Sequence, residues 1–311
     1  MVQTLNIKTI TMLVEQELDG MINSQVDLLT KASGHIIHAG GKRIRPQIVL
    51  LAYTTAGGQD VSCAVPLAAA VELIHTASLI HDDINDHSDL RRGRPTVNAH
   101  WGNTTALLTG DFIFGRLMKL IGSFDARVIQ VLANACVSIV EGETRQMLTL
   151  EDTRMTEETY LEIVRQKTAS LFAASAEAGG ILGQATEQQV QALAEYGLNL
   201  GMAFQIKDDA LDYVGRSDRL GKPMALDLAQ RKISLPIIAA LKKTDRIKSA
   251  LRAQNAQEVT RLLQETGGLD YAMNRAQEYA RKAKDSLSTL LYSWARVTLC
   301  QMADFAIARD E

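Results

Sequence analysis

The chain has 311 residues, of which 46% are hydrophobic and 22% charged, so it can bury a large core without disulfides or structural metals. Its formal net charge is −3 and it contains no block of lysine or arginine, which excludes the electrostatic footprint of a nucleic-acid-binding protein. The three cysteines, Cys63, Cys136 and Cys300, form no CxxC pair, and their odd number favours a reducing cytoplasm over a disulfide framework or a zinc site.

The amino-terminal segment lacks the pattern of a signal peptide, which is a basic stretch followed by an apolar core and a small-residue cleavage site. No apolar stretch approaches the roughly 20 residues that span a bilayer. We therefore expect a cytoplasmic protein with no stable membrane anchor and no nucleic-acid partner.

Long helices are predicted throughout the chain. Apolar residues recur at three- and four-residue spacing, and no proline occurs between Pro95 and Pro223. Since we find no internal repeat, low-complexity tract or linker, we expect a single all-α domain over residues 1–311. Four glycine pairs predict helix ends, and these are Gly40-Gly41, Gly57-Gly58, Gly179-Gly180 and Gly267-Gly268.

The first segment rich in cations is Gly41-Lys42-Arg43-Ile44-Arg45-Pro46, at a predicted junction between a loop and a helix. Arginine offers a planar fork that matches phosphate oxygens, and lysine offers a compact point charge, so this segment suits recognition of a diphosphate. The same holds for the three arginines of residues 90–96. Taken singly, such residues are more often solvated surface charges.

Between these two basic segments, an apolar helical stretch ends in Asp82, Asp83 and Asp86. Asp82 and Asp86 are one turn apart on one face of the helix. Carboxylates at this spacing repel each other, and a bound cation would remove that cost. The hard oxygen ligands suit Mg²⁺, which is usually held by one or two carboxylates together with waters and phosphate oxygens.

The middle of the chain carries two helix starts and another cation. Thr156, followed by two glutamates, predicts an N-cap with acids in the first helical turn. Lys167 stands beside Thr168 and is a further candidate for anion binding. Thr186 begins a segment with capping-box spacing, so the next helix should run from about residue 187 into the 210s.

That helix carries a second acidic cluster, Asp208, Asp209 and Asp212, with the spacing of the first. Gly197 and Gly201 precede it on one stripe, and glycine inside a helix costs about 1 kcal/mol relative to alanine, so another helix or a ligand should approach closely there. Solvated acidic helix faces are the alternative, but two copies that interrupt apolar stretches would be a rare coincidence. Two facing clusters would hold metal ions bridged by a diphosphate.

In this order and at these spacings, the segments resemble the trans-type polyprenyl diphosphate synthases, the family of farnesyl, geranylgeranyl and longer-chain synthases. The resemblance extends from Gly40 to Pro236 and is most specific in residues 41–46, in residues 75–96, at Lys167-Thr168 and in residues 204–212. It implies an all-α isoprenoid-synthase bundle with a central substrate cavity, usually a homodimer. It also implies condensation of isopentenyl diphosphate with an allylic prenyl diphosphate, with roughly two or three Mg²⁺ ions per active site.

The resemblance assigns roles to individual residues. The metal ligands would be Asp82, Asp83, Asp86, Asp208, Asp209 and Asp212, and these six, with Lys167 and Lys222, would be catalytic. The allylic diphosphate would be bound by Arg91, Lys167, Thr168, Gln205, Lys222 and Lys232. Isopentenyl diphosphate would be bound by Gly41, Lys42, Arg45, His75 and Arg92. One loop departs from the family pattern, because Ala225 and Arg231 stand where glycine is usual and Ser234 stands where threonine is usual.

Product length is expected to depend on the residues one helical turn before Asp82, namely Ala77 and Ser78, since the growing tail would meet them first. Short-chain members of the family often have a bulky aromatic residue there, so these small side chains resemble those of medium- or long-chain enzymes. We predict products of about six to ten isoprene units, with Leu120 and Leu132 as the floor of the channel.

Three other readings stay open from the sequence, besides a short-chain synthase of the same family. A class I terpene cyclase also ionises a prenyl diphosphate, but it usually carries a different second metal motif. A noncatalytic partner subunit would typically lose its acidic clusters, and both are complete here. A generic acidic helical scaffold would bind neither Mg²⁺ nor a diphosphate.

Overall fold

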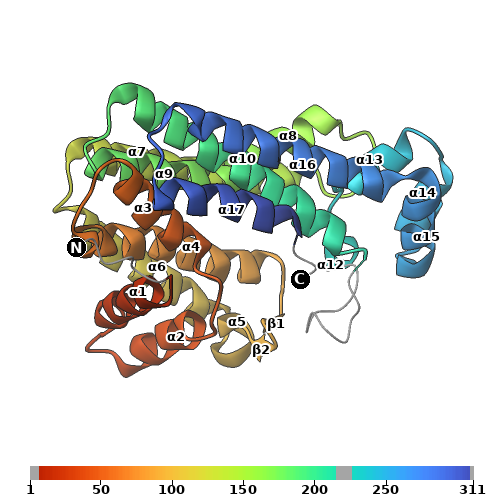
Figure 1. Cartoon of the computed structure of the whole chain (residues 1–311). Coiled ribbons are helices and arrows are strands. Elements are labelled where there is room, and N and C mark those ends of the chain that lie inside the picture. The colour runs from red at the N-terminus through yellow and green to blue at the C-terminus, as the bar shows by residue number, and fades with distance from the viewer. Residues whose placement is uncertain (1–6, 215–225, 309–311) are drawn as a thin grey trace. The chain divides into compact units, whose positions relative to one another are not determined.

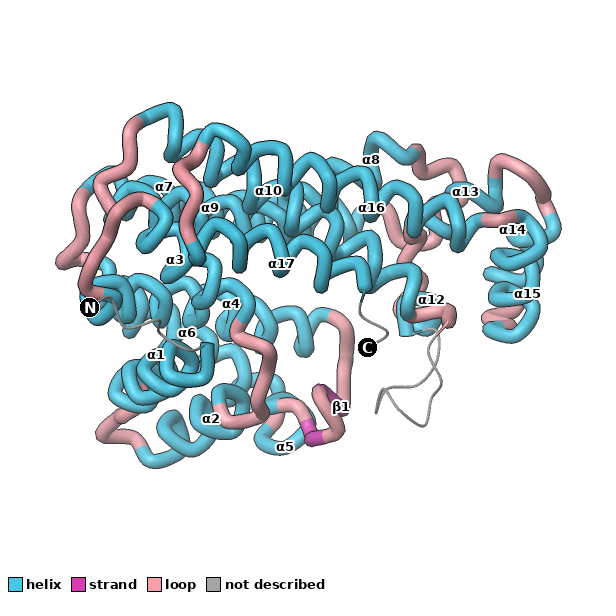
Figure 2. The backbone as a smooth tube through the Cα atoms, in the orientation of Figure 1, coloured by secondary structure: helices cyan, strands magenta, loops and turns pink. Residues whose placement is uncertain are grey.

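The computed structural model describes residues 7–214 and 226–308 (Figure 1). Within these ranges every regular element is a helix except one short hairpin (Figure 2), which confirms the all-α prediction. The chain divides into two compact units. Unit 1 comprises residues 1–136, 174–194 and 289–298, and unit 2 comprises residues 137–173, 195–288 and 299–311. The single domain expected from the sequence stays a prediction.

Unit 1 is built around the apolar helix α4. Its elements are α1 (Ile7–Met21), α2 (Asp27–Ile37), α3 (Ile44–Thr55), the 3₁₀ turn η1 (Val61–Ala64), α4 (Val65–Asn85), the strands β1 (Leu90–Arg91) and β2 (Arg94–Pro95), α5 (Val97–Trp101) and α6 (Asn103–Ile121). Helices α1, α3 and α6 pack against α4, and the small side chains of Ala68, Ala69 and Ala70 are fully buried. This packing holds α4 in place as far as its carboxyl end, where the first acidic cluster lies.

Among the residues described, the stretch Val61–Asn85 is long and apolar enough to cross a membrane, with a mean hydropathy of 1.7. The prediction that no stretch approaches this length is therefore wrong for this helix. This helix is apolar because it is buried: 72% of its most apolar segment is covered by the rest of the protein, as expected for a core helix.

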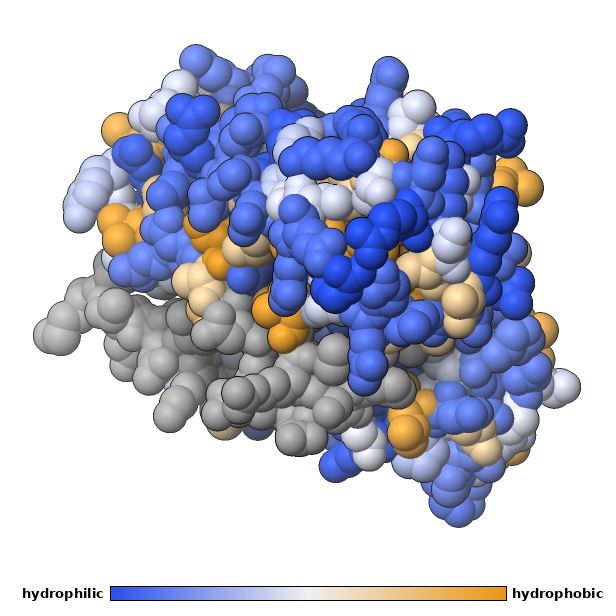
Figure 3. All heavy atoms as spheres, turned by 90° about the vertical axis from the view of Figure 1, so that its right-hand side faces the viewer, coloured by the Kyte–Doolittle hydropathy of each residue, from blue (hydrophilic) through white to orange (hydrophobic). Residues whose placement is uncertain are grey.

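Unit 2 contains α8 (Glu157–Val164), the π-helical turn η2 (Arg165–Ala169), α12 (Leu226–Ala229), α13 (Leu235–Leu241), α14 (Arg246–Arg252), α15 (Ala256–Thr266) and α16 (Gly268–Ser286). Five further elements contribute residues to both units, and these are α7 (Ala126–Leu148), α9 (Ser170–Leu182), α10 (Glu187–Leu211), η3 (Leu287–Thr289) and α17 (Trp294–Ala308). The buried core of unit 2 includes Tyr160, Ile206 and Ile237, and in this unit α13 packs against α15 and α16. The exposed side of α14 and α15 is mostly hydrophilic (Figure 3).

Most predicted helix ends are confirmed. Gly40-Gly41 and Gly57-Gly58 follow α2 and α3, and Gly267 caps α15 in the left-handed conformation with φ of 68°. The side-chain oxygen of Thr156 accepts a hydrogen bond from the backbone N–H of Thr159, as an N-cap should. The prediction at Gly179-Gly180 is wrong because α9 continues to Leu182. There a side chain on Gly179 would strike the backbone carbonyl of Val49 in α3, so glycine serves close helix packing instead.

The glycines that precede the second acidic cluster also serve packing between helices. A Cβ atom on Gly201 would lie 2.6 Å from the Cα of Ala169 in η2, and one on Gly197 would strike the backbone carbonyl of Phe172 in α9. Helix α10 therefore lies backbone to backbone against η2 and the start of α9. Of the two readings that the sequence left open, close approach of a helix is the one observed. It brings the turn that carries Thr168 next to the carboxyl end of α10.

We expect Gly201→Ala to destabilise the protein by about 1–3 kcal/mol, because the new methyl group cannot be accommodated without moving α10 away from Ala169. Gly115→Ala is the matched control in α6, where a Cβ would meet no atom within 4 Å, and it should stabilise by roughly 0.5–1 kcal/mol through helix propensity. Thermal denaturation of both variants checks this. Shifts of the melting temperature in the same direction would contradict the packing role of Gly201.

Candidate active site

The first acidic cluster lies at the carboxyl end of α4, and its middle member is held by an arginine. Asp83 is only 2% exposed, whereas Asp82 and Asp86 are half-buried. The Nε atom of Arg91 donates to both carboxylate oxygens of Asp83 at 3.0 Å, and its Nη2 atom donates to Oδ1 at 2.7 Å. Burial opposes a charge on Arg91, but this bidentate pair more than compensates and raises the pKa of its guanidinium.

The hairpin that carries Arg91 also places Arg92. Arg92 and Gly93 form its two-residue turn, with φ of 52° and 73°, the left-handed pair typical of tight hairpins. The guanidinium of Arg92 then lies against the Cα atom of Gly41, since a Cβ there would be 2.7 Å from its Nη1 atom. Gly41 also has φ of 145°, so glycine is required both by the backbone and by this approach.

A cationic cluster forms around this contact in unit 1. Burial, and then the positive charges of Arg45 and Arg92, hold the pKa of His75 well below its ordinary value, so the imidazole is neutral near pH 7. Burial and the neighbouring guanidiniums likewise lower the pKa of Arg92. Gly41, Arg45, His75 and Arg92, which the sequence assigned to one diphosphate, are thus brought together, and Lys42 is exposed beside them. Crowded cations of this kind favour a bound anion.

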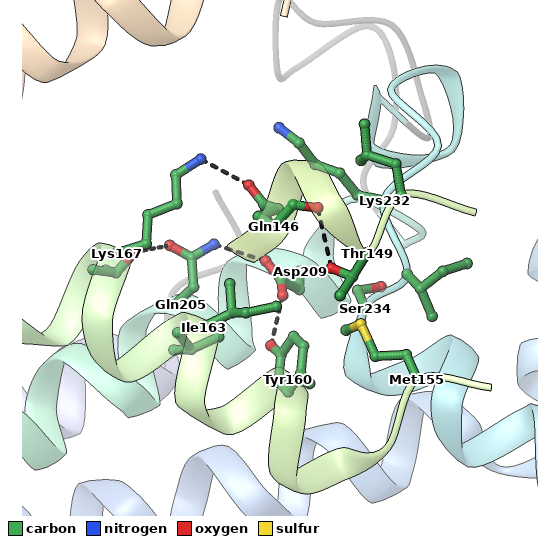
Figure 4. Close-up of a pocket in the computed structure, with 14 residues that line it drawn as sticks. Gln146, Thr149, Met155, Tyr160, Ile163, Lys167, Gln205, Asp209, Lys232 and Ser234 are labelled. Atoms are coloured by element: carbon green, nitrogen blue, oxygen red, sulfur yellow. Dashed lines mark hydrogen bonds between the residues drawn. The ribbon is translucent and has the colours of Figure 1, made fainter. Parts of the chain in front are cut away.

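The second acidic cluster lies at the carboxyl end of α10 in unit 2, and Figure 4 shows its middle member, Asp209. The Tyr160 hydroxyl donates to Oδ2 of Asp209 at 2.6 Å, and Nε2 of Gln205 donates to Oδ1 at 2.7 Å. Burial raises the pKa of Asp209 to about 6, the two hydrogen bonds oppose that shift, and the charges of Asp208 and Asp212 add to it. A cation near these three carboxylates would relieve their repulsion.

The π-helical turn η2 places Lys167 and Thr168 opposite this cluster. The Thr168 hydroxyl donates to Oε1 of Gln205 at 2.9 Å, so Thr168, Gln205 and Asp209 form a continuous hydrogen-bonded series. The Nζ atom of Lys167 forms an ion pair with Glu143 and donates to Oε1 of Gln146 at 2.8 Å. This is possible because α7 touches η2 at Gly142, where a Cβ would lie 2.5 Å from the backbone nitrogen of Lys167.

Lys167, Thr168, Gln205 and Asp209 line a pocket in unit 2 together with other polar and apolar side chains (Figure 4). Met155, Ile163 and Ile233 are among the apolar lining residues. Lys232 also lines the pocket, and its Nζ atom donates to Oε1 of Gln230 at 2.7 Å. Lys222 and Ala225 lie outside the described residues. Arg231 pairs with Glu151 at 2.9 Å on the exposed surface.

Tyr160, Glu143 and Gln146 were missed by the sequence analysis. Each acts by holding a predicted residue in place, and none belongs to a motif. The sequence contains one signal for these residues, which is helical spacing. Tyr160 lies seven residues, or about two helical turns, before Lys167, and Glu143 lies three residues before Gln146. Such spacing is common in any helix, so it could not have singled them out.

The residues predicted to set product length lie in unit 1. Ala77 and Leu132 are buried, whereas Ser78 and Leu120 are half-buried. The Ser78 hydroxyl donates to the backbone carbonyl of His75 at 2.8 Å. Their part in a channel stays a prediction.

The family model of the polyprenyl synthetases matches residues 26–266 of this chain. The chain belongs to the polyprenyl synthetase family. It is 38% identical over 307 residues to the octaprenyl diphosphate synthase of Haemophilus influenzae, covering 96% of this chain and 93% of that protein. It is 39% identical over 297 residues to the short chain isoprenyl diphosphate synthase of Methanothermobacter thermautotrophicus, covering 91% of each chain. The family resemblance drawn from the sequence is therefore confirmed, and so is prenyltransferase activity.

A solved structure extends the comparison to the fold. The polyprenyl synthase of Caulobacter crescentus, complexed with calcium and isoprenyl diphosphate, is 36% identical and superposes with a TM-score of 0.93, covering 98% of this chain and 96% of that one. The donors in both acidic clusters of the present synthetase are carboxylate oxygens, which suit a hard divalent cation. In the part of the chain that is described, no group of three or more His, Cys, Asp or Glu side chains is arranged so that it could hold a metal ion by itself.

In this polyprenyl synthetase, we expect Tyr160→Phe to lower the turnover number about tenfold, since Asp209 loses a hydrogen bond to a charged group worth about 1.5–3 kcal/mol. Tyr271→Phe is the matched control, because the Tyr271 hydroxyl donates to Glu157 over the same 2.6 Å in unit 2 and lines no part of the pocket. Steady-state assays of both variants, with circular dichroism to verify folding, check this. Equal loss of turnover in both variants would show that the hydrogen bond matters only for stability.

Proposed function

We propose that this synthetase condenses isopentenyl diphosphate with an allylic prenyl diphosphate, in a Mg²⁺-dependent reaction, to build a trans-polyprenyl diphosphate. The proposal rests on one observation, which is that the chain has two different sets of cationic residues, each suited to one diphosphate. Gly41, Arg45, His75 and Arg92 form a cationic cluster in unit 1, which suits a diphosphate that is kept. Lys167 and Lys232 line a pocket with Asp209, which suits a diphosphate that leaves with a metal ion.

The carboxylates of both acidic clusters are the proposed Mg²⁺ ligands. Asp82, Asp86, Asp208 and Asp212 are half-buried and accessible to an ion. Asp83 and Asp209 already accept hydrogen bonds from within their own units, so they also orient their clusters. When bound, Mg²⁺ supplies Lewis-acid stabilisation of the charge that develops on the leaving diphosphate.

The side chains of this chain then have definite tasks. Arg91 keeps Nη1 outside its pair with Asp83, so it can bind the allylic diphosphate. Lys167 has the same proposed role. Lys232 adds a further cation, and Lys222 has the same proposed role. As the carbon–oxygen bond of the allylic diphosphate breaks, the oxygens of Thr168 and Gln205 can stabilise the allylic cation.

The double bond of isopentenyl diphosphate attacks that cation and forms the new carbon–carbon bond. The proton next to the resulting cationic centre is lost to the released diphosphate, which serves as the base. Met155, Ile163 and Ile233 add apolar surface to the pocket, and apolar surroundings protect an allylic cation from attack by water. The neutral His75 can donate a hydrogen bond to isopentenyl diphosphate without adding charge.

We further propose a homodimer in the cytoplasm with no stable membrane anchor. Leu107, Phe114 and Met118 recur at helical spacing on α6 and are 40–52% exposed, which is unusual for such large apolar side chains on a monomer. Light scattering of the purified chain distinguishes one copy from two.

We expect Asp82→Asn and Asp208→Asn to lower turnover by several orders of magnitude, since each removes a proposed ligand used when the carbon–oxygen bond breaks. Folding stability should change little or rise, because repulsion between carboxylates is relieved. Asp270→Asn, at an exposed site in α16, is the control. Near-normal turnover of both cluster variants at saturating Mg²⁺, measured with labelled isopentenyl diphosphate, would defeat the metal assignment.

Product length provides a separate prediction, because the relatives include both an octaprenyl and a short-chain synthase at similar identity. We propose products of about six to ten isoprene units, as expected where small residues stand one turn before Asp82. Ala77→Phe and Ser78→Phe should shorten the product while leaving the first condensation active. Sizing of the dephosphorylated products from several allylic primers checks this. A wild-type product of three or four units, or unchanged lengths in both variants, would contradict it.

A further inference from the structure

Arg43 combines a buried charge with an unusual backbone conformation, and it lies between two residues of the cationic cluster. Its φ of 46° and ψ of 41° are left-handed, a conformation that costs an ordinary residue about 1–2 kcal/mol. Only 3% of its side chain is exposed. Glycine would adopt this backbone without strain, so the guanidinium must be what the position requires.

The guanidinium joins three helices. Its Nε atom donates to Glu15 of α1 at 2.6 Å, and its Nη1 atom donates to Glu72 of α4 at 2.7 Å. Its Nη2 atom donates to the backbone carbonyl of Ile37, the last residue of α2, at 2.6 Å and to Glu15 at 3.3 Å. Glu72 is as deeply buried as Arg43, whereas the Glu15 side chain is 34% exposed. A lysine ammonium cannot reproduce this planar, three-sided set of bonds.

These bonds fix the loop on both sides of Arg43. On one side, Gly41 lies under the guanidinium of Arg92, and the backbone carbonyl of Lys42 accepts a hydrogen bond from Nε2 of Gln47 at 2.7 Å. On the other side, α3 begins at Ile44 and carries Arg45 in its first turn. The Arg43 backbone thus sets the direction in which Lys42 and Arg45 leave the loop.

The same bonds fix the loop relative to α4. Glu72 lies three residues before His75, so the two side chains are on one face of α4 and about one helical turn apart. The pair of Arg43 with Glu72 therefore sets the distance between the loop and the imidazole, whose pKa responds to the charge of Arg45.

We propose that Arg43 is the positioning residue of the isopentenyl diphosphate subsite. It touches no substrate, and it acts by holding Lys42 and Arg45 in register with His75 and Arg92. This inference rests on the proposed function, since it presumes that these residues bind isopentenyl diphosphate.

The alternative explanation is that Arg43 only stabilises the fold. The energetics of buried ion pairs distinguish this structural role from the positioning role. Removing one partner leaves an uncompensated buried charge and is strongly destabilising, whereas replacing both by apolar side chains of similar size is often neutral. The double variant Arg43→Met/Glu72→Met should therefore fold. It retains the apolar contacts but loses the bonds that orient the loop.

The experiment is a two-substrate steady-state analysis of Arg43→Lys and of the double variant. We expect the KM for isopentenyl diphosphate to rise roughly 10- to 100-fold in both, as for a misplaced binding group, with kcat and the KM for the allylic diphosphate nearly unchanged. Direct binding of isopentenyl diphosphate by calorimetry should weaken in parallel. Arg116→Lys is the control, because Arg116 likewise donates from both Nε and Nη2, although to the backbone carbonyls of Met21 and Gly20, and lies outside the cluster.

Each outcome decides the matter. A folded double variant with a normal KM for isopentenyl diphosphate would overturn the proposal, and so would equal increases in the KM of both substrates. Loss of affinity in Arg116→Lys of the same size would show a general effect of lost arginine contacts. If the wild-type chain neither binds nor consumes isopentenyl diphosphate, the proposed function itself fails. That result is distinguishable, because it concerns the wild type and not the variants.

Discussion

Charge buried among apolar helices must have a fixed partner, and the candidate active site depends on this constraint throughout. Desolvation of an unpaired charge costs several kcal/mol, so a buried ion needs a bonded partner. Arg43 is held by Glu15 and Glu72, and Asp83 is held by Arg91. Bonds of this kind are directional, so they fix where the remaining charged atoms point. Electrostatic stabilisation of a developing charge depends on such preorganisation.

The same constraint explains why supporting residues lie so close to those that meet substrate. Asp209 is oriented by Tyr160 and Gln205, and Gln205 is oriented in turn by Thr168. A series of this kind keeps a carboxylate, an amide and a hydroxyl in one arrangement. It needs a close approach of backbones, which Gly201 permits. A glycine, which has no side chain to meet substrate, is thereby part of the electrostatics of the site.

The sequence predicted those features that depend on local spacing. The helix of residues 187–211, the N-cap at Thr156 and both acidic clusters follow from periodicity and capping, which are local. The end predicted at Gly179 failed because a glycine that ends a helix and a glycine that touches another helix look alike in sequence. Tyr160 and Glu143 were missed for a related reason, since their partners, Asp209 and Lys167, are 49 and 24 residues away and only folding brings them together.

The π-helical turn at Arg165–Ala169 has a consequence for how this chain can vary in length. Such a turn holds one more residue than an α-helical turn, and each residue of a helix rotates the side chains by roughly 100°. Loss of a single residue from this turn would leave an ordinary α-helical turn and would keep α8, with Tyr160, in phase with α9. One residue added elsewhere between Tyr160 and Phe172 would instead rotate Tyr160 by roughly 100° relative to α9, so the π-helical turn is the place in this stretch where the chain can lose a residue.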